Sequence, residues 1–133
     1  MAKTYKEIFE MDGFSFLKWL KVNFPVTVPE SIETIEDMEN ASKLMLKLSA
    51  EYSYINELAA YAKVYTRGLK RLVDKEDPQS KDFYEDMVDK KDAIEGKMKA
   101  IHQAYQGISR AITVKMENNS ELRMTGNRYV HIA

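Results

Sequence analysis

Cysteine is absent from the 133 residues of this sequence. Its absence excludes disulfides, thiolate metal sites and cysteine nucleophiles, and it suits a reducing compartment. No apolar run of about 18 residues occurs, so we expect no segment that spans a membrane. Residues 1–13 lack the apolar core and the small-residue cleavage site of a signal peptide. These absences lead us to expect a cytoplasmic protein.

Glycine and proline are scarce, with five and three residues. Both residue types interrupt helices, so their scarcity predicts few turns and long elements. Hydrophobic residues make up 44% and charged residues 31% of the chain, which is enough apolar material to offset the entropy of folding. We expect one domain over residues 1–133, because a chain of this length has room for one modest core.

The first long helix is predicted to run from about Ile32 or Thr34 to about Asp74. Apolar residues recur in alternating steps of three and four, as in a coiled coil. This row consists of Met38, Ala41, Met45, Leu48, Tyr52, Ile55, Ala59, Ala62, Thr66, Leu69 and Val73. Ser31 or Thr34 can cap the first turn, and Pro78 cannot continue the helix.

The same rhythm returns in a second long helix, predicted to run from about Ser80 to a point between Glu117 and Met124. Its apolar row begins at Tyr84 and ends at Ile112. The glycine in the run Met-Thr-Gly-Asn at residues 124–127 is a helix stop signal, so the remaining residues are expected to form a tail.

The two helices are predicted to form an antiparallel hairpin, because a loop of only about five residues joins them. Each arm is about 60 Å long at 1.5 Å per residue. The expected pairs across the hairpin are Leu69 with Met87, Ala62 with Ile94, Ile55 with Ile101, and Leu48 with Ile108. The predicted fold class is all-α, with a short helical segment over residues 1–30, the hairpin over residues 31–126 and a tail over residues 127–133.

A short N-terminal helix is predicted to dock its apolar face, with Phe16, Trp19 and Leu20, on one end of the hairpin. Its three turns span about 15 Å and cannot cover a groove of about 60 Å. Monomers rarely expose so long an apolar stripe, so we expect a homo-oligomer that associates through the hairpins. The expected interface residues are Leu48, Ile55, Leu58, Ala62, Ile101 and Ile108.

Patterns for catalysis and metal binding are missing. Acidic residues recur from Asp82 to Asp92, but their place in the first turns of a helix suits pairing with its positive end. Neither His102 nor His131 has a Glu or His three or four residues away that would complete a helical metal pair. No glycine-rich phosphate loop or nucleophile elbow occurs. We expect no enzyme, no cofactor and no metal site.

Residues 61–71, YAKVYTRGLKR, combine two tyrosines with four cations. Cations that neutralise phosphates and rings that stack on bases together favour sequence-independent binding of single strands. A second basic set is formed by Arg110, Lys115, Arg123 and Arg128, and the two sets could meet in an antiparallel oligomer. The expected nucleic-acid-binding residues are Tyr61, Lys63, Tyr65, Arg67, Lys70, Arg71, Arg110 and Lys115. The alternative is that Tyr65 belongs to the core and the cations are solvated surface near the helix end.

The hairpin, with VYTRGLKR at residues 64–71 and ISRAITVK at residues 108–115, resembles the phage recombination mediator (UvsY) family. The matching residues are Tyr65, Arg67, Gly68 and Lys70, together with Ile108, Arg110 and Ile112. The resemblance implies a small, all-helical, oligomeric, non-enzymatic protein that binds single-stranded DNA and a recombinase, in the cytoplasm of a phage host. The alternative function is a phage assembly, virion or regulatory protein that acts through protein–protein contacts only. Its wide apolar stripe and eight methionines would suit adaptable contacts.

Overall fold

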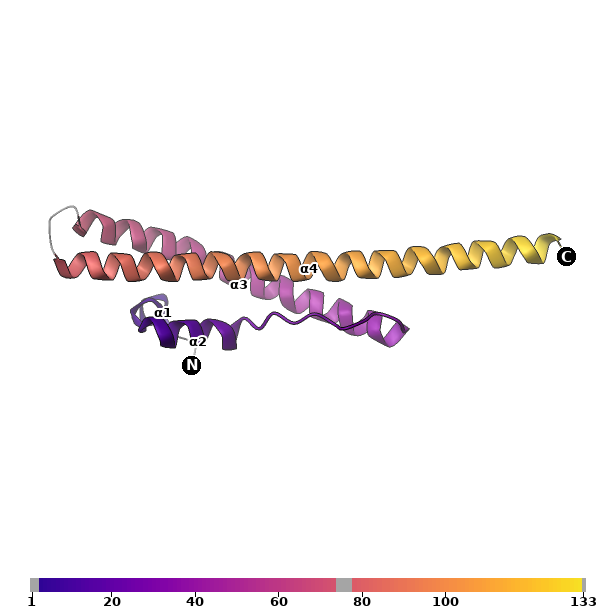
Figure 1. The fold of residues 1–133 in the computed structure, drawn as a ribbon, viewed down its shortest axis with the longest axis horizontal. Coiled ribbons are helices and arrows are strands. Elements are labelled where there is room, and N and C mark those ends of the chain that lie inside the picture. The colour runs from indigo at the N-terminus through magenta and orange to yellow at the C-terminus, as the bar shows by residue number, and fades with distance from the viewer. Residues whose placement is uncertain (1–2, 74–77, 133) are drawn as a thin grey trace.

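The computed structural model describes residues 3–73 and 78–132, and for residues 119–132 it describes the backbone only. These ranges contain the helices α1 (Tyr5–Glu10), α2 (Gly13–Asn23), α3 (Ile35–Val73) and α4 (Pro78–Ile132), and no strand. α3 and α4 run antiparallel and pack against each other, and α4 extends beyond the start of α3 (Figure 1). The all-α hairpin is therefore confirmed. None of the helices in these ranges carries an apolar stretch of the length that a bilayer requires.

Side-chain caps explain where α2 and α3 begin. Asp12 Oδ1 accepts a hydrogen bond from the N–H of Ser15 at 2.8 Å. Thr34 Oγ1 accepts from the N–H of Asp37 at 3.0 Å, and the Asp37 carboxylate accepts in return from the N–H groups of Glu33 and Thr34. These bonds satisfy amides that a helix start leaves without partners. The backbone bonds from Ser15 and Glu33 also lower the pKa of Asp12 and Asp37, because they favour the ionised carboxylate.

The two long helices meet at the hairpin loop with slightly different bounds from those predicted. α3 ends at Val73, and the predicted end at Asp74 lies outside the described residues. α4 begins at Pro78, two residues before the predicted start at about Ser80. Proline suits the first helical position, because its missing N–H would have no partner there and its fixed φ angle is already helical.

The far end of α4 is longer than predicted. The helix continues to Ile132, past the predicted end between Glu117 and Met124, so residues 127–132 are helical rather than a tail. A single glycine such as Gly126 costs a helix only about 1 kcal/mol relative to alanine, which weakens the helix without ending it.

The core between α3 and α4 follows the predicted apolar rows. The Tyr52 ring of α3 lies 5.9 Å from the His102 ring of α4, and Leu69 and Met87 line one hollow. Both pairs agree with the predicted register within two residues. The buried apolar residues of the two helices are Ala41, Leu48, Ile55, Leu58, Ala62, Met87, Ile94, Ile101, Ala104 and Ile108.

The N-terminal segment, residues 3–34, packs along the hairpin. α1 lies against α3 and α2 lies against α4, and an extended connector then runs to the start of α3 (Figure 1). Phe16 and Leu20 of α2 are buried and Trp19 is partly buried, so the predicted docking of this helix is confirmed.

Residues 13–32 reach further along α4 than a helix of 20 residues could. At their start, a Cβ placed on Gly13 would lie 3.9 Å from Asp86 Oδ1. Near their end, Ile32 lines a hollow with Val114 and Asn118. Extended chain spans up to about 3.3 Å per residue against 1.5 Å for a helix, so the connector covers the length that α2 alone would leave exposed.

The six residues predicted to form an oligomer interface are core residues of a single chain. Leu48, Ile55, Leu58, Ala62, Ile101 and Ile108 are each at most 2% exposed. The prediction assumed that only a short helix covers the hairpin, whereas two helices and a connector pack on it. These six side chains are not available to a second copy in this arrangement, and a surface for self-association has to lie elsewhere.

Candidate binding surface

Three tyrosines of α3 hold the N-terminal segment. Each tyrosine ring packs against one aromatic ring of that segment. Between ring centroids, Tyr54 lies 5.4 Å from Phe24, Tyr61 lies 4.1 Å from Tyr5 and Tyr65 lies 5.5 Å from Phe9. Residues 54, 61 and 65 are spaced by seven and four, so they lie in one row along the helix. We call the side of the hairpin that carries this row the covered flank.

A buried lysine fixes the turn between α1 and α2 on the covered flank. The Lys90 side chain is 3% exposed, and its Nζ donates to the carbonyl oxygens of Phe9, at 2.8 Å, and of Met11. It also donates to Asp86 Oδ2 at 2.6 Å and lies 5.8 Å from the centroid of the Phe16 ring. A buried ammonium needs such partners to offset its lost hydration. In the sequence, Asp86 and Lys90 resemble an ordinary exposed pair four residues apart.

Tyr61 and Tyr65 are placed differently from the prediction. Lys63, Arg67 and Lys70 follow one another at spacings of four and three, so they share one face of α3. The two tyrosines face α1 on another side, and each already packs against an aromatic ring of the same chain. Rings that could stack on bases and cations that could bind phosphates are therefore not interleaved on a single face.

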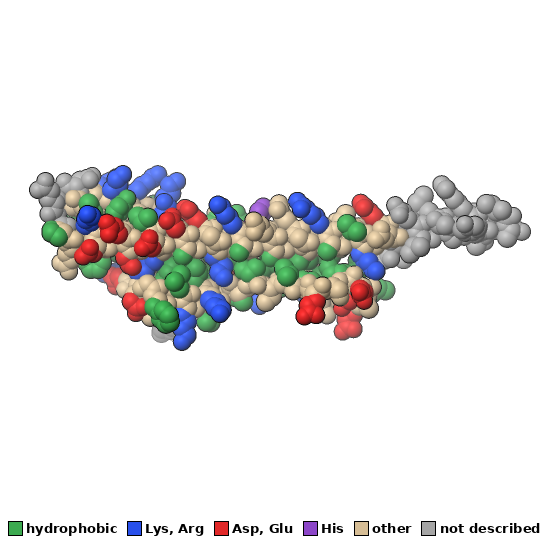
Figure 2. Space-filling model, in the orientation of Figure 1, with side chains coloured by type: hydrophobic (Ala, Val, Ile, Leu, Met, Phe, Trp, Pro, Cys, Tyr) green, Lys and Arg blue, Asp and Glu red, His purple; other side chains and the backbone are tan. Residues whose placement is uncertain are grey.

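The cations lie on the side of α3 away from the N-terminal segment, which we call the open flank. These cations are Lys63, Arg67, Lys70 and Arg71, and all four are exposed. Among the residues that the structure describes, none of them forms an ion pair. Residues 58–73 contain no acidic residue. Figure 2 shows Lys and Arg atoms gathered over the end of α3 at the hairpin loop. We call these four residues the basic row.

Three of the acidic residues near the start of α4 lie on the covered flank. Asp82, Asp86 and Asp89 are spaced by four and three and share one face of the helix. Asp86 binds Lys90 beside the α1–α2 turn, so this face belongs to the covered flank. In the described ranges, no three acidic, histidine or cysteine side chains are grouped as a metal site would require.

Lys91 adds a cation to the open flank that the sequence analysis missed. It is spaced by two heptads from Tyr105, which lines a groove with Tyr52 of α3. The apolar rhythm of α4 includes position 91, so the sequence placed Lys91 in the core row, but its side chain is only half-buried. The spacing of two heptads between Lys91 and Tyr105, which places both on one face of α4, could have been read from the sequence.

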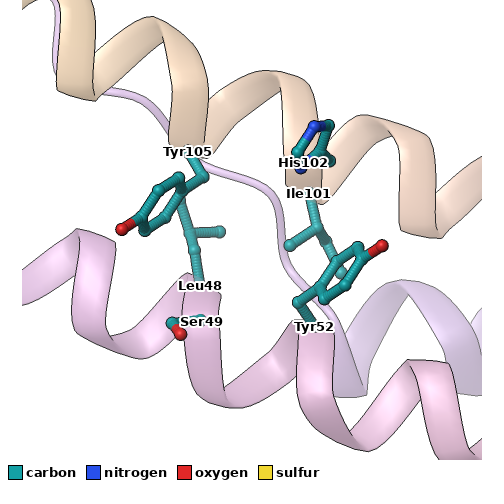
Figure 3. Close-up of a pocket in the computed structure, with 6 residues that line it drawn as sticks. All are labelled: Leu48, Ser49, Tyr52, Ile101, His102 and Tyr105. Carbon is teal, nitrogen blue, oxygen red and sulfur yellow. The ribbon is translucent and has the colours of Figure 1, made fainter.

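A groove with aromatic sides opens between α3 and α4 on the open flank. Its lining consists of Leu48, Ser49 and Tyr52 of α3 and Ile101, His102 and Tyr105 of α4, around a volume of about 160 Å³. Figure 3 shows Tyr52 and Tyr105 on either side of Leu48 and Ile101, with the two hydroxyls pointing away from each other. We call it the tyrosine groove. Sequence reasoning assigned Leu48, Tyr52, Ile101 and Tyr105 to the apolar rows and gave His102 no role at the surface.

The second predicted basic set lies elsewhere. Arg110 and Lys115 line a hollow with Ile32, where the connector approaches the start of α3. The basic row lies at the opposite end of α3, next to the hairpin loop, so one chain does not bring the two sets together. The side chains of Arg123 and Arg128 are outside the described residues.

No protein-family model, curated protein or solved structure matches this chain.

Proposed function

We propose that this chain is a non-enzymatic helical protein that binds the phosphate backbone of single-stranded nucleic acid through the basic row. The observation that supports this function is the exposure of Lys63, Arg67, Lys70 and Arg71 along a stretch of α3 that contains no acidic residue. Lys91 extends the positive surface onto α4. The chain has a net charge of −1, and the basic row is a local concentration of positive charge on α3.

Binding of this kind is driven by the release of counterions from the nucleic acid. It is independent of base sequence, and its affinity falls steeply as salt is added. Tyr61 and Tyr65 each pack against a ring of the N-terminal segment and lie on a different face from the basic row, so they have no stacking role in this proposal and the affinity rests on charge. The basic row alone does not select single strands over duplex; that preference comes from the resemblance to recombination mediators.

The resemblance also suggests the process in which the protein acts. As a recombination mediator it would form a homo-oligomer and contact a recombinase while its basic rows hold the strand. Basic rows from several copies would give a longer positive path than one chain offers. The phage origin, the oligomer and the recombinase are proposals that rest on the quoted motifs.

The test is a titration of a labelled single-stranded thymidine oligonucleotide, and of a duplex of equal length, at two salt concentrations. The variant Arg67→Ala/Arg71→Ala should weaken binding and reduce the salt slope by about 0.7 for each lost contact to a single strand. Lys18→Ala/Lys21→Ala on α2 is the matched control, because it removes the same charge from exposed positions that lie outside the basic row. No binding of the unaltered protein at low salt, or equal losses in both variants, would contradict the proposal.

A second candidate is an assembly or regulatory protein that acts through protein contacts alone. The observation in its favour is the exposure of large apolar side chains, which reaches 82% at Phe14, 77% at Ile35 and 74% at Leu46. Such contacts would persist as salt is added, whereas phosphate binding would not. Binding to a protein that is insensitive to salt, without any binding of nucleic acid, would favour this candidate.

A further inference from the structure

A hollow near the loop end of the hairpin is lined by aromatic rings from three helices. Phe9 comes from α1, Tyr65 from α3 and Phe83 from α4, around a volume of about 330 Å³. Phe83 is 57% exposed and Tyr65 is 36% exposed, so both rings keep accessible surface. Sites for small-molecule ligands usually have volumes of about 300–1,000 Å³. We call this hollow the aromatic hollow.

Two carboxylates line the aromatic hollow together with the rings. They belong to Glu10 of α1, which is exposed, and to Asp86 of α4, which is half-buried. Asp86 Oδ2 binds Lys90, so these two side chains together carry no net charge. Lys6 Nζ lies 3.9 Å from Glu10 Oε1, but both side chains are exposed, and pairs of this kind are weak. Glu10 therefore gives the lining a net negative charge.

The charges around the aromatic hollow also favour a cation. Asp82 and Asp89 lie on the same face of α4 as Asp86, one turn to either side of it, and both are exposed. Lys81 and Glu85 are exposed four residues apart on another face and offset each other. The basic row of α3 lies on the open flank. A cavity lined by charge of one sign attracts ligands of the opposite sign, so the ligand that fits here is positive.

The rest of the lining favours a quaternary ammonium over a cation that donates hydrogen bonds. Apart from the two carboxylates and Tyr65, it consists of the apolar side chains of Phe9, Leu69, Phe83 and Met87. A guanidinium or a primary ammonium carries several N–H donors, and donors that lose water without gaining an acceptor cost free energy. A quaternary ammonium has no N–H group. Its methyl groups suit apolar side chains, and aromatic rings attract its charge.

We propose that the aromatic hollow binds a small organic cation with a quaternary ammonium group. Tyr65 and Phe83 contact the cation with their rings, Leu69 contacts its methyl groups, and Glu10 supplies the opposite charge. These four side chains all keep exposed surface, whereas the buried Met87 closes the floor behind them. The site lies apart from the basic row, so the proposal does not depend on nucleic-acid binding.

The test is NMR of the full chain with labelled leucine and methionine methyl groups. Choline chloride is titrated to millimolar concentration at constant ionic strength. The comparison probes are the uncharged tert-butyl analogue of choline, which has the same shape, and methylguanidinium. We expect saturable shifts of the Leu69 and Met87 methyl signals with choline, and weaker binding of both comparison probes.

Two variants test the residues assigned to the site. Phe83→Leu removes the most exposed ring and Glu10→Gln removes the net charge, and each should weaken choline binding about two- to fivefold. Phe14→Leu and Glu85→Gln are the matched controls, because they make the same changes at exposed positions that do not line the hollow. Both should leave binding unchanged, and circular dichroism checks that each variant keeps its helices.

Three results would overturn the proposal of a quaternary ammonium site. They are the absence of a saturable shift with choline, equally strong binding of the uncharged analogue or of methylguanidinium, and equal losses in the two site variants and their controls. If Phe83→Leu loses helicity, Glu10→Gln decides the question, because Glu10 is exposed and its replacement removes a charge without opening the core.

Discussion

The two flanks of the hairpin place the same residue type in different surroundings. On the covered flank, Tyr54, Tyr61 and Tyr65 each receive an aromatic ring from the N-terminal segment. On the open flank, Tyr52 and Tyr105 border a groove that the N-terminal segment does not fill. The role of a tyrosine in this chain therefore depends on which row of the helix it occupies, and not on the cations beside it in the sequence.

Neighbouring lysines show the same contrast. Lys90 is buried on the covered flank, where two backbone carbonyls and Asp86 bind its ammonium group. Lys91, the next residue, lies on the open flank. A rotation of about 100° around α4 separates a buried lysine that binds the N-terminal segment from one that lies half-buried on the open flank. The covered flank should therefore respond to mutation through stability, and the open flank through binding.

The largest effect is expected in the core that both flanks share. Ile55 is fully buried, so Ile55→Ala should destabilise the fold by about 2–5 kcal/mol, through lost burial and the cavity left behind. Leu46→Ala is the matched control on the same helix. Leu46 is 74% exposed, and its truncation should change stability by no more than about 0.5 kcal/mol. Chemical denaturation followed by circular dichroism measures both, and equal losses would contradict the buried position of Ile55.

Replacing the buried lysine should release the N-terminal segment. Lys90→Met leaves the carbonyl oxygens of Phe9 and Met11 without their donor, and each buried polar group without a partner costs about 1–3 kcal/mol. Stability should fall by at least the cost of one such group, and the emission of Trp19 should shift to the red while the hairpin keeps its helicity. Lys99→Met, at an exposed position of α4, should change neither quantity. Unchanged thermal stability and tryptophan emission in Lys90→Met would contradict the structural role of this lysine.

The tyrosines allow a direct comparison of the two flanks. Tyr61→Ala removes the ring that stacks on Tyr5 at 4.1 Å, and such pairs contribute about 0.5–1.5 kcal/mol beyond the burial of their area. Tyr105→Ala on the open flank should cost less, because no ring partner of Tyr105 is described among the residues 3–73 and 78–118. Thermal unfolding of the two variants gives the comparison, and a larger loss in Tyr105→Ala would reverse the assignment of the flanks.

The same variant should alter the titration of Tyr5. Burial, and secondly the carboxylate of Glu57, raise the pKa of Tyr5 to about 12. The folded protein holds this proton more tightly than the unfolded chain, so stability should fall as pH rises from about 10. In Tyr61→Ala the Tyr5 ring is less buried, and its pKa should move down towards 10 in an absorbance titration. No change in that titration would show that the stacking does not contribute to the burial of Tyr5.

Periodicity in the sequence was enough to predict the hairpin, its register and most of its core. Steps of three and four report which positions of a helix face inwards. They do not report what packs on those positions, and for this reason Ile55 and Leu58 were assigned to an interface between copies. The covering connector, residues 24–34, has no regular pattern of its own. The prediction considered only the length of the short helix and left out the length that this connector spans when it is extended.

The site was harder to predict than the fold, because its residues are defined by two helices at once. A helical projection of α3 separates Tyr61 and Tyr65 from the basic row, so this part was available from the sequence. The equal spacing of four between Tyr5 and Phe9 and between Tyr61 and Tyr65 was a further signal that the rings pair. The tyrosine groove, in contrast, requires the packing of Tyr52 against α4, which no single-helix pattern contains.

The smallest expected effect is a gain in stability at Glu51, where a carboxylate is partly buried among core positions. Its Oε2 is buried without a hydrogen-bond partner among the described residues. Burial raises the pKa of Glu51, although Lys47 and Lys97 act in the opposite direction. The folded state therefore binds this proton more tightly than the unfolded chain, and the ionised carboxylate opposes folding at neutral pH. Glu51→Gln should raise the melting temperature at pH 7, by less than the shifts produced by the preceding variants.

The pH dependence distinguishes this explanation from a general effect of surface charge. As pH falls through the raised pKa, the unaltered carboxyl group becomes protonated and neutral like the glutamine, so the gain in melting temperature should disappear by about pH 4. Glu39→Gln removes the same charge from an exposed position of α3 and should show no gain at either pH. A gain at Glu51 that persists unchanged at low pH would mean that packing of the amide, and not the buried charge, is responsible. A loss of stability at pH 7 would mean that the attraction to Lys47 and Lys97 outweighs the cost of burying the carboxylate.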